Sequence, residues 1–219
     1  MTLVLTALSG VAWTIVYIEA IRIGFKQQTY AMPIAALSLN IAWESIYSIH
    51  DLATAPGLQA YINVVWALAD IVILYTFFRY GRAELPTFVT GPVFIASGVT
   101  MLGASVAIQL LFIREFGMVD MRAAQYSAFL QNLLMSGLFI AMFVARRGAR
   151  GQSITIGVAK WIGTLAPTLA FGEIRDSPFI LGIGILCSVF DLAYIALLLW
   201  VRTKPPQVVG CPNPSIVNK

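Results

Sequence analysis

The chain has 219 residues, of which 59% are hydrophobic and only 11% are charged, and its mean hydropathy is +0.83. A soluble domain carries about 25% charged residues, so this composition excludes a soluble globular protein and predicts an integral membrane protein. The formal net charge of +4 comes from fourteen Lys and Arg residues, whose positions between apolar segments indicate membrane topology rather than nucleic-acid binding.

Seven apolar segments follow one another, each close to the roughly 20 residues that a spanning helix needs. They cover approximately residues 2–25, 31–49, 58–78, 87–113, 123–145, 153–172 and 178–201. The connections between them are short, so consecutive helices should be antiparallel neighbours. We therefore expect residues 1–202 to form an all-α, polytopic bundle of seven transmembrane helices.

The basic residues alternate between the two sides of this bundle. Ten of them fall at the first, third and fifth connections and in the tail: Arg22, Lys26, Arg79, Arg82, Arg146, Arg147, Arg150, Arg202, Lys204 and Lys219. The opposite connections hold only Arg114, Arg122 and Arg175. Positive charge marks the cytoplasmic side, which predicts an outside N-terminus and a cytoplasmic C-terminus. Residues 203–219 contain four prolines without a helical period, and we expect a disordered tail.

One proline lies deep in a predicted span. Pro167 falls inside the segment 153–172, where it removes a helical N–H and clashes with the preceding turn. A tolerated kink is the simpler expectation, and a local cavity is the alternative.

Four of the ten acidic residues fall inside the segments: Glu19, Glu44, Asp70 and Asp191. A carboxyl group there costs about 2.5 kcal/mol or more, and burial favours its neutral form, which is a proton donor. Glu19 stands three residues before Arg22, so an interfacial ion pair is expected for it.

The other three acids have different alternatives. Asp70 is expected either to pair with Lys160, a basic residue deep in the sixth segment, or to act in function, and both remain open. Glu44 and Asp191 have no basic residue within one turn of their own helices, which favours a functional role. At about 1.5 Å per residue, Glu44 lies about 10 Å and Asp191 about 20 Å below the outer surface, a mismatch if the two act together.

Polar and aromatic residues recur at helical spacing on four of the segments, so that each set shares one face. The sets are Asn40, Trp43, Glu44 and Tyr47; Asn63, Trp66 and Asp70; Gln125, Asn132 and Ser136 with Gln131 beside them; and Cys187, Asp191 and Tyr194. We expect these faces to point into the bundle. For Asn63, Gln125 and Ser136, hydrogen bonds that only hold helices together are the simpler alternative.

Metal and cofactor sites are not indicated. His50 is the lone histidine and the two cysteines are scattered, so no metal-ligand set is predicted. The sequence also lacks phosphate-binding loops and nucleophile elbows.

The stretch Asn-Ile-Ala-Trp-Glu-Ser-Ile-Tyr at 40–47, together with Phe-Asp-Leu-Ala-Tyr at 190–194, resembles the integral membrane terpene cyclases of meroterpenoid and indole-diterpene pathways. Further matching stretches lie at 66–70, 131–136 and 160–165, and the likeness covers about residues 1–202. The pairing of Asn-x-x-Trp-Glu with the late Asp is its most specific part.

The resemblance implies an isomerase- or lyase-type enzyme, free of metal and cofactor, that protonates an epoxide or terminal alkene. Its substrate would be a prenylated, most simply farnesylated, indole or aromatic, and the essential acids of the family map onto Glu44 and Asp191. The residues expected to bind substrate or tune the acids are Asn40, Trp43, Tyr47, Trp66, Asp70, Gln131, Asn132, Lys160 and Tyr194.

The rival interpretation is a small proton-coupled transporter, because intramembrane carboxylates also serve as proton relays. A retinal-binding receptor is disfavoured because the seventh segment has no lysine. In either main interpretation the partners are a small molecule and the lipid bilayer. The membrane is expected to be a bacterial inner or plasma membrane or the endoplasmic reticulum.

Overall fold

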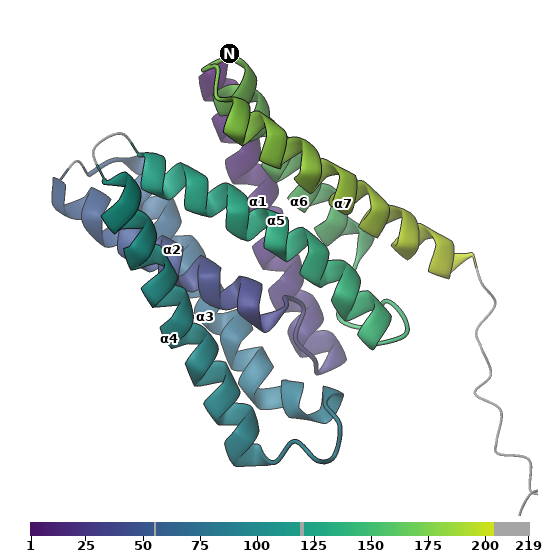
Figure 1. Ribbon diagram of the computed structural model, residues 1–219. Helices are drawn as coiled ribbons and strands as arrows, with labels where there is room; N and C mark the ends of the chain where they lie inside the picture. The colour runs from purple at the N-terminus through teal and green to yellow at the C-terminus, as the bar shows by residue number, and fades with distance from the viewer. Residues whose placement is uncertain (55, 119–120, 204–219) are drawn as a thin grey trace, which may run out of the picture.

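The computed structural model describes residues 1–54, 56–118 and 121–203, and all regular elements within these ranges are helical (Figure 1). The α-helices are α1 (Thr2–Gln27), α2 (Ile34–Thr54), α3 (Leu58–Tyr80), α4 (Gly91–Phe116), α5 (Arg122–Ala145), α6 (Ile154–Pro167) and α7 (Pro178–Arg202). A 3₁₀ helix, η1 (Gly81–Glu84), follows α3, and a π-helix, η2 (Thr168–Glu173), follows α6. The all-α prediction is confirmed. Apart from Thr203, the tail predicted to be disordered lies outside the described residues.

Six helical segments of the described chain are long and apolar enough to cross a membrane. They are Thr2–Gln27, Leu58–Glu84, Gly91–Phe116, Arg122–Ala145, Ile154–Glu173 and Pro178–Arg202. The polytopic fold is therefore confirmed, whereas the count of seven spans and the orientation stay predictions. The helix outside this set is α2, whose polar residues Asn40, Glu44 and Asp51 lower its hydropathy.

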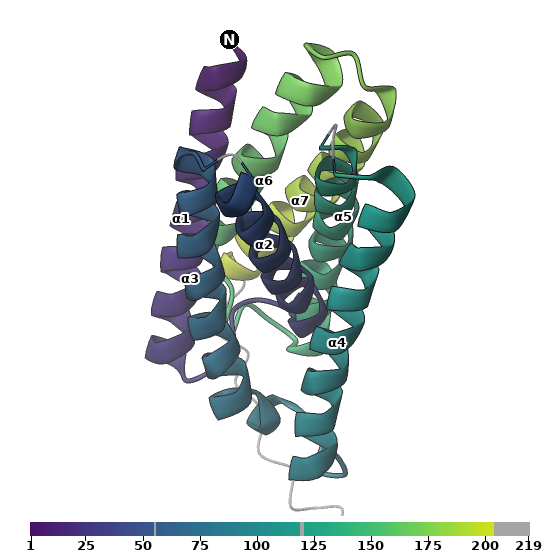
Figure 2. The same ribbon diagram turned by 90° about the vertical axis from the view of Figure 1, so that its left-hand side faces the viewer.

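The polar helix α2 occupies the interior of the bundle. It packs against α3, α4 and α5, and Figure 2 shows it running obliquely between α3 and α4. On the other side, α1 packs along α6 and α3, while α7 packs on α5, α6 and η2. Because neighbouring helices cover α2, its polar groups are shielded from lipid and can face one another.

The sixth span changes its helical type at Pro167. This residue ends α6, and the next six residues form the π-helix η2. Proline lacks the N–H for an α-helical hydrogen bond and its ring clashes with the carbonyl of the residue four positions earlier, which favours the end of regular α-helix at this position. The regular α-helix thus ends at Pro167, and this residue also lines the cavity described below, in agreement with the alternative of a local cavity.

The π-helix η2 approaches α7 closely enough to require glycine. A Cβ atom on Gly172 would lie 2.8 Å from the Cα and 2.9 Å from the N of Leu181. Since those are backbone atoms, Gly172→Ala is expected to lower the free energy of unfolding by about 1–3 kcal/mol. Gly182→Ala on α7 is the matched control, because its Cβ would meet nothing within 4 Å. Thermal unfolding midpoints in one detergent check this expectation, and equal midpoints for the two variants would contradict it.

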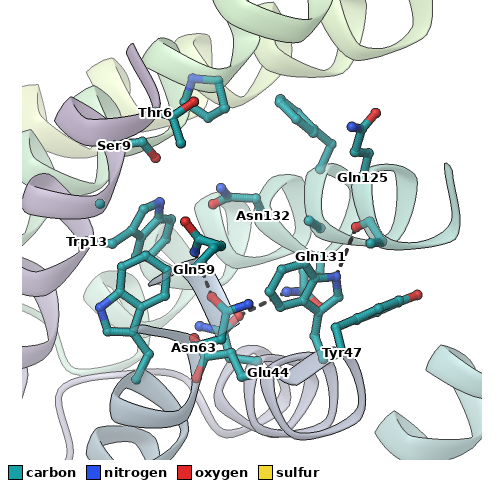
Figure 3. A pocket seen from close by; sticks show the side chains of 18 of the residues that line it. Thr6, Ser9, Trp13, Glu44, Tyr47, Gln59, Asn63, Gln125, Gln131 and Asn132 are labelled. Carbon is teal, nitrogen blue, oxygen red and sulfur yellow. Dashed lines mark hydrogen bonds between the residues drawn. The ribbon is translucent and has the colours of Figure 1, made fainter. Parts of the chain in front are cut away.

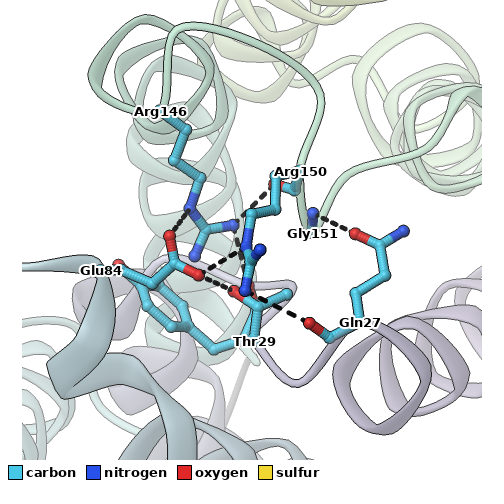
Figure 4. A network of polar contacts seen from close by, with 7 residues as sticks. Gln27, Thr29, Glu84, Arg146, Arg150 and Gly151 are labelled. Carbon is cyan, nitrogen blue, oxygen red and sulfur yellow. Dashed lines mark hydrogen bonds and ion pairs between the residues drawn. The ribbon is translucent and has the colours of Figure 1, made fainter.

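Glu84 ties three connections together at one end of the bundle (Figure 4). Its Oε1 accepts a hydrogen bond from Thr29 Oγ1 at 2.8 Å and pairs with Arg150 Nε at 2.8 Å, while Oε2 lies 3.8 Å from Arg146 Nε. The Arg146 guanidinium also covers the Tyr30 ring at 4.2 Å. One carboxylate thus joins the connection before α2, η1, and the connection before α6, using two of the basic residues that indicated topology.

Candidate active site

A cavity of about 290 Å³ lies between α1, α2, α3, α5 and the α6–η2 segment (Figure 3). Its aromatic wall residues include Trp13, Tyr17, Trp43, Tyr47, Trp66 and Phe129. Its amide residues are Asn40, Gln59, Asn63, Gln125, Gln131 and Asn132. The wall also holds two carboxyls, Glu44 and Asp51, and the hydroxyls of Thr6, Ser9 and Thr164, but no Lys, Arg or His within the described part of the chain.

Glu44 presents one free carboxyl oxygen at this cavity. The residue is only 4% exposed, and its Oε1 accepts a hydrogen bond from the Tyr17 hydroxyl of α1. Its Oε2 is buried and has no hydrogen-bond partner among the described residues. The Tyr17 ring stacks on Trp66 of α3, with centroids 5.9 Å apart. Glu44 is therefore anchored through Oε1, while Oε2 is left buried without a hydrogen-bond partner in the described chain.

The predicted inward face of α2 is confirmed, since Asn40, Trp43 and Tyr47 all line the cavity with Glu44. Trp43 Nε1 donates to the carbonyl of Ala124 at 2.9 Å, and the Trp43 and Tyr47 rings lie 5.1 Å apart. These contacts hold the two rings in the wall between α2 and α5.

The amides of α3 and α5 also reach the cavity. Gln131 Nε2 donates to Asn40 Oδ1 at 3.2 Å, and Gln131 Oε1 accepts from Gln109 Nε2 of α4 at 3.0 Å. On α3, Gln59 Nε2 donates to Asn63 Oδ1 at 2.8 Å. Part of each predicted polar stripe thus lies in one wall, to which Trp66, Gln125 and Asn132 also belong, whereas Asp70 of α3 and Ser136 of α5 do not line it.

Asp191 lies behind this wall rather than in it. Its Oδ1 and Oδ2 accept from Lys160 Nζ at 2.8 and 3.0 Å, and Lys160 Nζ also donates to Ser136 Oγ at 2.6 Å. Asp191 thus does not line the cavity with Glu44, because α7 contributes no residue to the described cavity wall, and its catalytic role stays a prediction. The alternative that Lys160 pairs with Asp70 is wrong, because the Lys160 ammonium forms its ion pair with Asp191.

Asp70 and Tyr194 also lie outside the cavity wall. Asp70 is fully buried on α3, and neither of its carboxyl oxygens has a hydrogen-bond partner in the described ranges. Tyr194 packs against Phe139 with ring centroids 5.3 Å apart.

The ion pair expected for Glu19 is confirmed, because Arg22 Nε and Nη2 meet its carboxylate at 2.6 and 2.8 Å.

Sequence reasoning missed the contribution of α1 to the site. Thr6, Ser9, Trp13 and Tyr17 all line the cavity, and they follow one another at intervals of three or four residues. That helical spacing was a usable signal, although none of these side chains is charged. Thr164 of α6 was missed as well, and its hydroxyl accepts from Asn132 Nδ2 at 2.8 Å.

The described residues contain no cluster of metal ligands. Nowhere in residues 1–54, 56–118 and 121–203 do three His, Cys, Asp or Glu side chains gather as a metal would require. No donor set for a metal can therefore be named in that part of the chain.

Known proteins similar to this chain are terpene cyclases of fungi. Terpene cyclase pyr4 of Aspergillus fumigatus is 26% identical over 219 aligned residues, covering 89% of this chain and 84% of the relative. Terpene cyclase paxB of Penicillium paxilli is 25% identical over 228 residues, covering 95% and 89%. The Pyr4-family terpene cyclase mfmH of Annulohypoxylon moriforme is 28% identical over 166 residues, covering 74% of this chain but only 66% of the relative, just under two thirds.

No solved structure matches this chain. The family of Pyr4-like transmembrane terpene cyclases, by contrast, matches residues 1–204. That range contains every described helix and the whole cavity wall. The chain therefore belongs to the Pyr4-like transmembrane terpene cyclases.

Proposed function

We propose that this protein is a membrane-embedded cyclase that protonates an epoxide or terminal alkene of a prenylated indole or other aromatic and so starts cationic ring closure. The observation that carries the proposal is the buried Glu44 carboxyl, with Oε2 unpartnered among the described residues, in an aromatic cavity. No basic side chain lines the described cavity wall, and burial of a carboxyl without a counter-charge favours its neutral, proton-bearing form. The family membership supports the cyclase class.

The proton step assigns different tasks to the two Glu44 oxygens. Oε2 gives its proton to the epoxide oxygen, whose C–O bond breaks, or to the alkene carbon, whose π electrons form the new C–H bond. The carboxylate that remains is stabilised by the hydrogen bond from Tyr17 to Oε1. After ring closure, a carbon of the cation loses a proton to a base. One proton has then been added and one removed, so the product is an isomer of the substrate.

The aromatic rings suit the cation that this step creates. Trp13, Tyr17 and Trp66 form one contiguous group, with Trp13 and Tyr17 centroids 6.4 Å apart. The face of each ring is expected to stabilise a nearby cation by about 0.5–2 kcal/mol when water is excluded. A dry, apolar wall also keeps water from capturing the cation before the rings have closed.

The charges of the wall favour a neutral substrate. Its described residues include two carboxyls and six amides but no basic side chain, whereas a diphosphate is usually held by Lys, Arg or a metal ion. A prenylated aromatic has no such charge and is soluble in the bilayer around the helices. We propose the plasma membrane or the endoplasmic reticulum as its site.

Asp191 takes a changed role in this proposal. Its carboxylate is engaged by Lys160 on α6, so we assign proton donation to Glu44 alone. In this proposal Asp191 is a positioning residue for the wall. The catalytic role that the resemblance implies for it stays a separate prediction.

The proposal is tested by incubating membranes that contain the protein with a farnesylated indole and with epoxyprenyl aromatics. A product with the mass of the substrate and new ring signals in its NMR spectrum is the expected result. Membranes with the Glu44→Gln variant are the control. Unchanged substrate that accumulates inside sealed vesicles would instead identify a proton-coupled transporter, because carriers change no bonds.

A further inference from the structure

The side-chain amide of Asn132 is held in one orientation. Thr164 Oγ1 donates its single proton to the carbonyl of Lys160, one turn earlier, at 2.9 Å. It can then only accept a further hydrogen bond, so the Asn132 atom that meets it at 2.8 Å is the donor Nδ2. The carbonyl oxygen Oδ1 must therefore point away from Thr164.

The buried ion pair stands directly behind this amide. Lys160 Nζ, bound to Asp191 of α7, also donates to Ser136 Oγ at 2.6 Å, and Ser136 donates to the main-chain oxygen of Asn132 at 2.9 Å. Lys160 and Asp191 are 0% and 1% exposed. The pair thus joins α6 and α7 to the turn of α5 that carries Asn132, and it fixes where Thr164 meets the amide.

Three polar atoms of the cavity wall are open, in the sense that no described residue forms a hydrogen bond with them: Glu44 Oε2, Asn132 Oδ1 and the Tyr47 hydroxyl oxygen. The amides of Gln131, Asn40 and Asn63 bond one another or a neighbour, whereas Asn132 Oδ1 and Glu44 Oε2 are buried without a partner within the described chain. In Figure 3 these two residues come from different walls, α5 and α2. A buried acceptor without a partner is unfavourable, so each open atom is a natural contact for a ligand.

We propose that Asn132 Oδ1 accepts a hydrogen bond from an N–H or O–H group on the aromatic head of the substrate. Thr164 and the Lys160–Asp191 pair are positioning residues that aim this acceptor. The inference rests on the proposed function, in which Glu44 Oε2 meets the reactive end of the prenyl chain. A substrate that lies between Asn132 Oδ1 and Glu44 Oε2 would present its aromatic head to the first atom and its epoxide or alkene to the second.

The test compares a prenylated indole or phenol with its N-methyl or O-methyl form, which lacks the donor. We expect the protein to prefer the free donor by at least about tenfold in kcat/KM, because the methylated form leaves Oδ1 unpaired. Asn132→Leu and Thr164→Val should bring the ratio close to one, since the second frees the amide to turn. Thr164→Ser keeps the hydroxyl and should keep the preference. Both kcat/KM values of a ratio are measured on the same preparation of a variant. The fraction of folded protein therefore cancels from the ratio.

Binding provides a readout that does not need turnover. Analogues with a saturated prenyl chain cannot react, and quenching of tryptophan fluorescence reports their binding. The same preference of at least about tenfold in Kd is expected for the free donor. If both forms bind and react equally, the inference is wrong while the proposed function stands.

Two further outcomes would overturn the inference. Asn132→Leu could instead lower kcat/KM equally for both substrates and leave the preference unchanged. The Asn132 amide would then act on the cationic intermediate or only stabilise the fold, and the inference would be wrong. A preference retained in Thr164→Val would remove the positioning role. If no substrate is cyclised but the saturated analogues still show the preference, the proposed function fails and the acceptor role survives.

Discussion

Replacing Glu44 by glutamine is expected to lower kcat/KM for cyclisation by at least about 100-fold, the lower range of what a positioned general acid contributes. Glutamine has nearly the same volume and retains a carbonyl that can accept from Tyr17. It has no acidic proton to transfer. Initial rates in membranes, normalised to the amount of folded protein, measure the loss.

Glu19→Gln is the matched control for this variant. Glu19 lies on α1 but outside the cavity wall, where it pairs with the exposed Arg22. The change there removes one charge at a helix surface and should leave kcat/KM within about twofold, because exposed ion pairs contribute little. Full cyclisation by Glu44→Gln would refute the assignment of the proton donor.

The second large effect is expected at the buried ion pair. Asp191→Asn leaves the Lys160 ammonium buried without a counter-charge, which costs about 3–5 kcal/mol, and both stability and cyclisation should collapse. The double variant Lys160→Met/Asp191→Leu removes both charges together. Since apolar replacement of a whole buried pair is often close to neutral, the thermal unfolding midpoint should recover.

Activity in the double variant separates positioning from proton donation. If Asp191 only holds the wall, recovered packing should restore cyclisation to at least about tenfold above the single variant, because the chemistry at Glu44 is intact. A proton donor cannot be replaced by leucine. Recovery of the unfolding midpoint without any recovery of cyclisation would therefore show that Asp191 takes part in the chemistry.

Helix periodicity predicted the face of α2 well. Asn40, Trp43, Glu44 and Tyr47 share a face by spacing alone, and the structure places all four at the cavity. The end of α2 was less predictable, because polar residues after 49 resemble a connection. The helix continues to Thr54 and places Asp51 in the cavity wall.

The partner of Lys160 was beyond the reach of spacing. Periodicity tells which residues of one helix share a face, but the choice between Asp70 and Asp191 depends on which helices pack against α6. Because α7 packs on α6 and α3 does not contact it closely, the pair forms with Asp191. The depth difference expected between Glu44 and Asp191 stays a prediction, while the cavity wall contains Glu44 and not Asp191.

The contacts of the Glu84 cluster lie at one end of the bundle. Glu84 binds Thr29, Arg146 and Arg150 at the end where α1, α3 and α5 finish, whereas the cavity wall includes Asp51 and Gln59, at the opposite end of α2 and α3. Charged contacts thus hold one end of the bundle together, and the cavity reaches toward the other end. We expect a prenyl chain to enter, and the bulkier cyclised product to leave, at the end that carries Asp51 and Gln59.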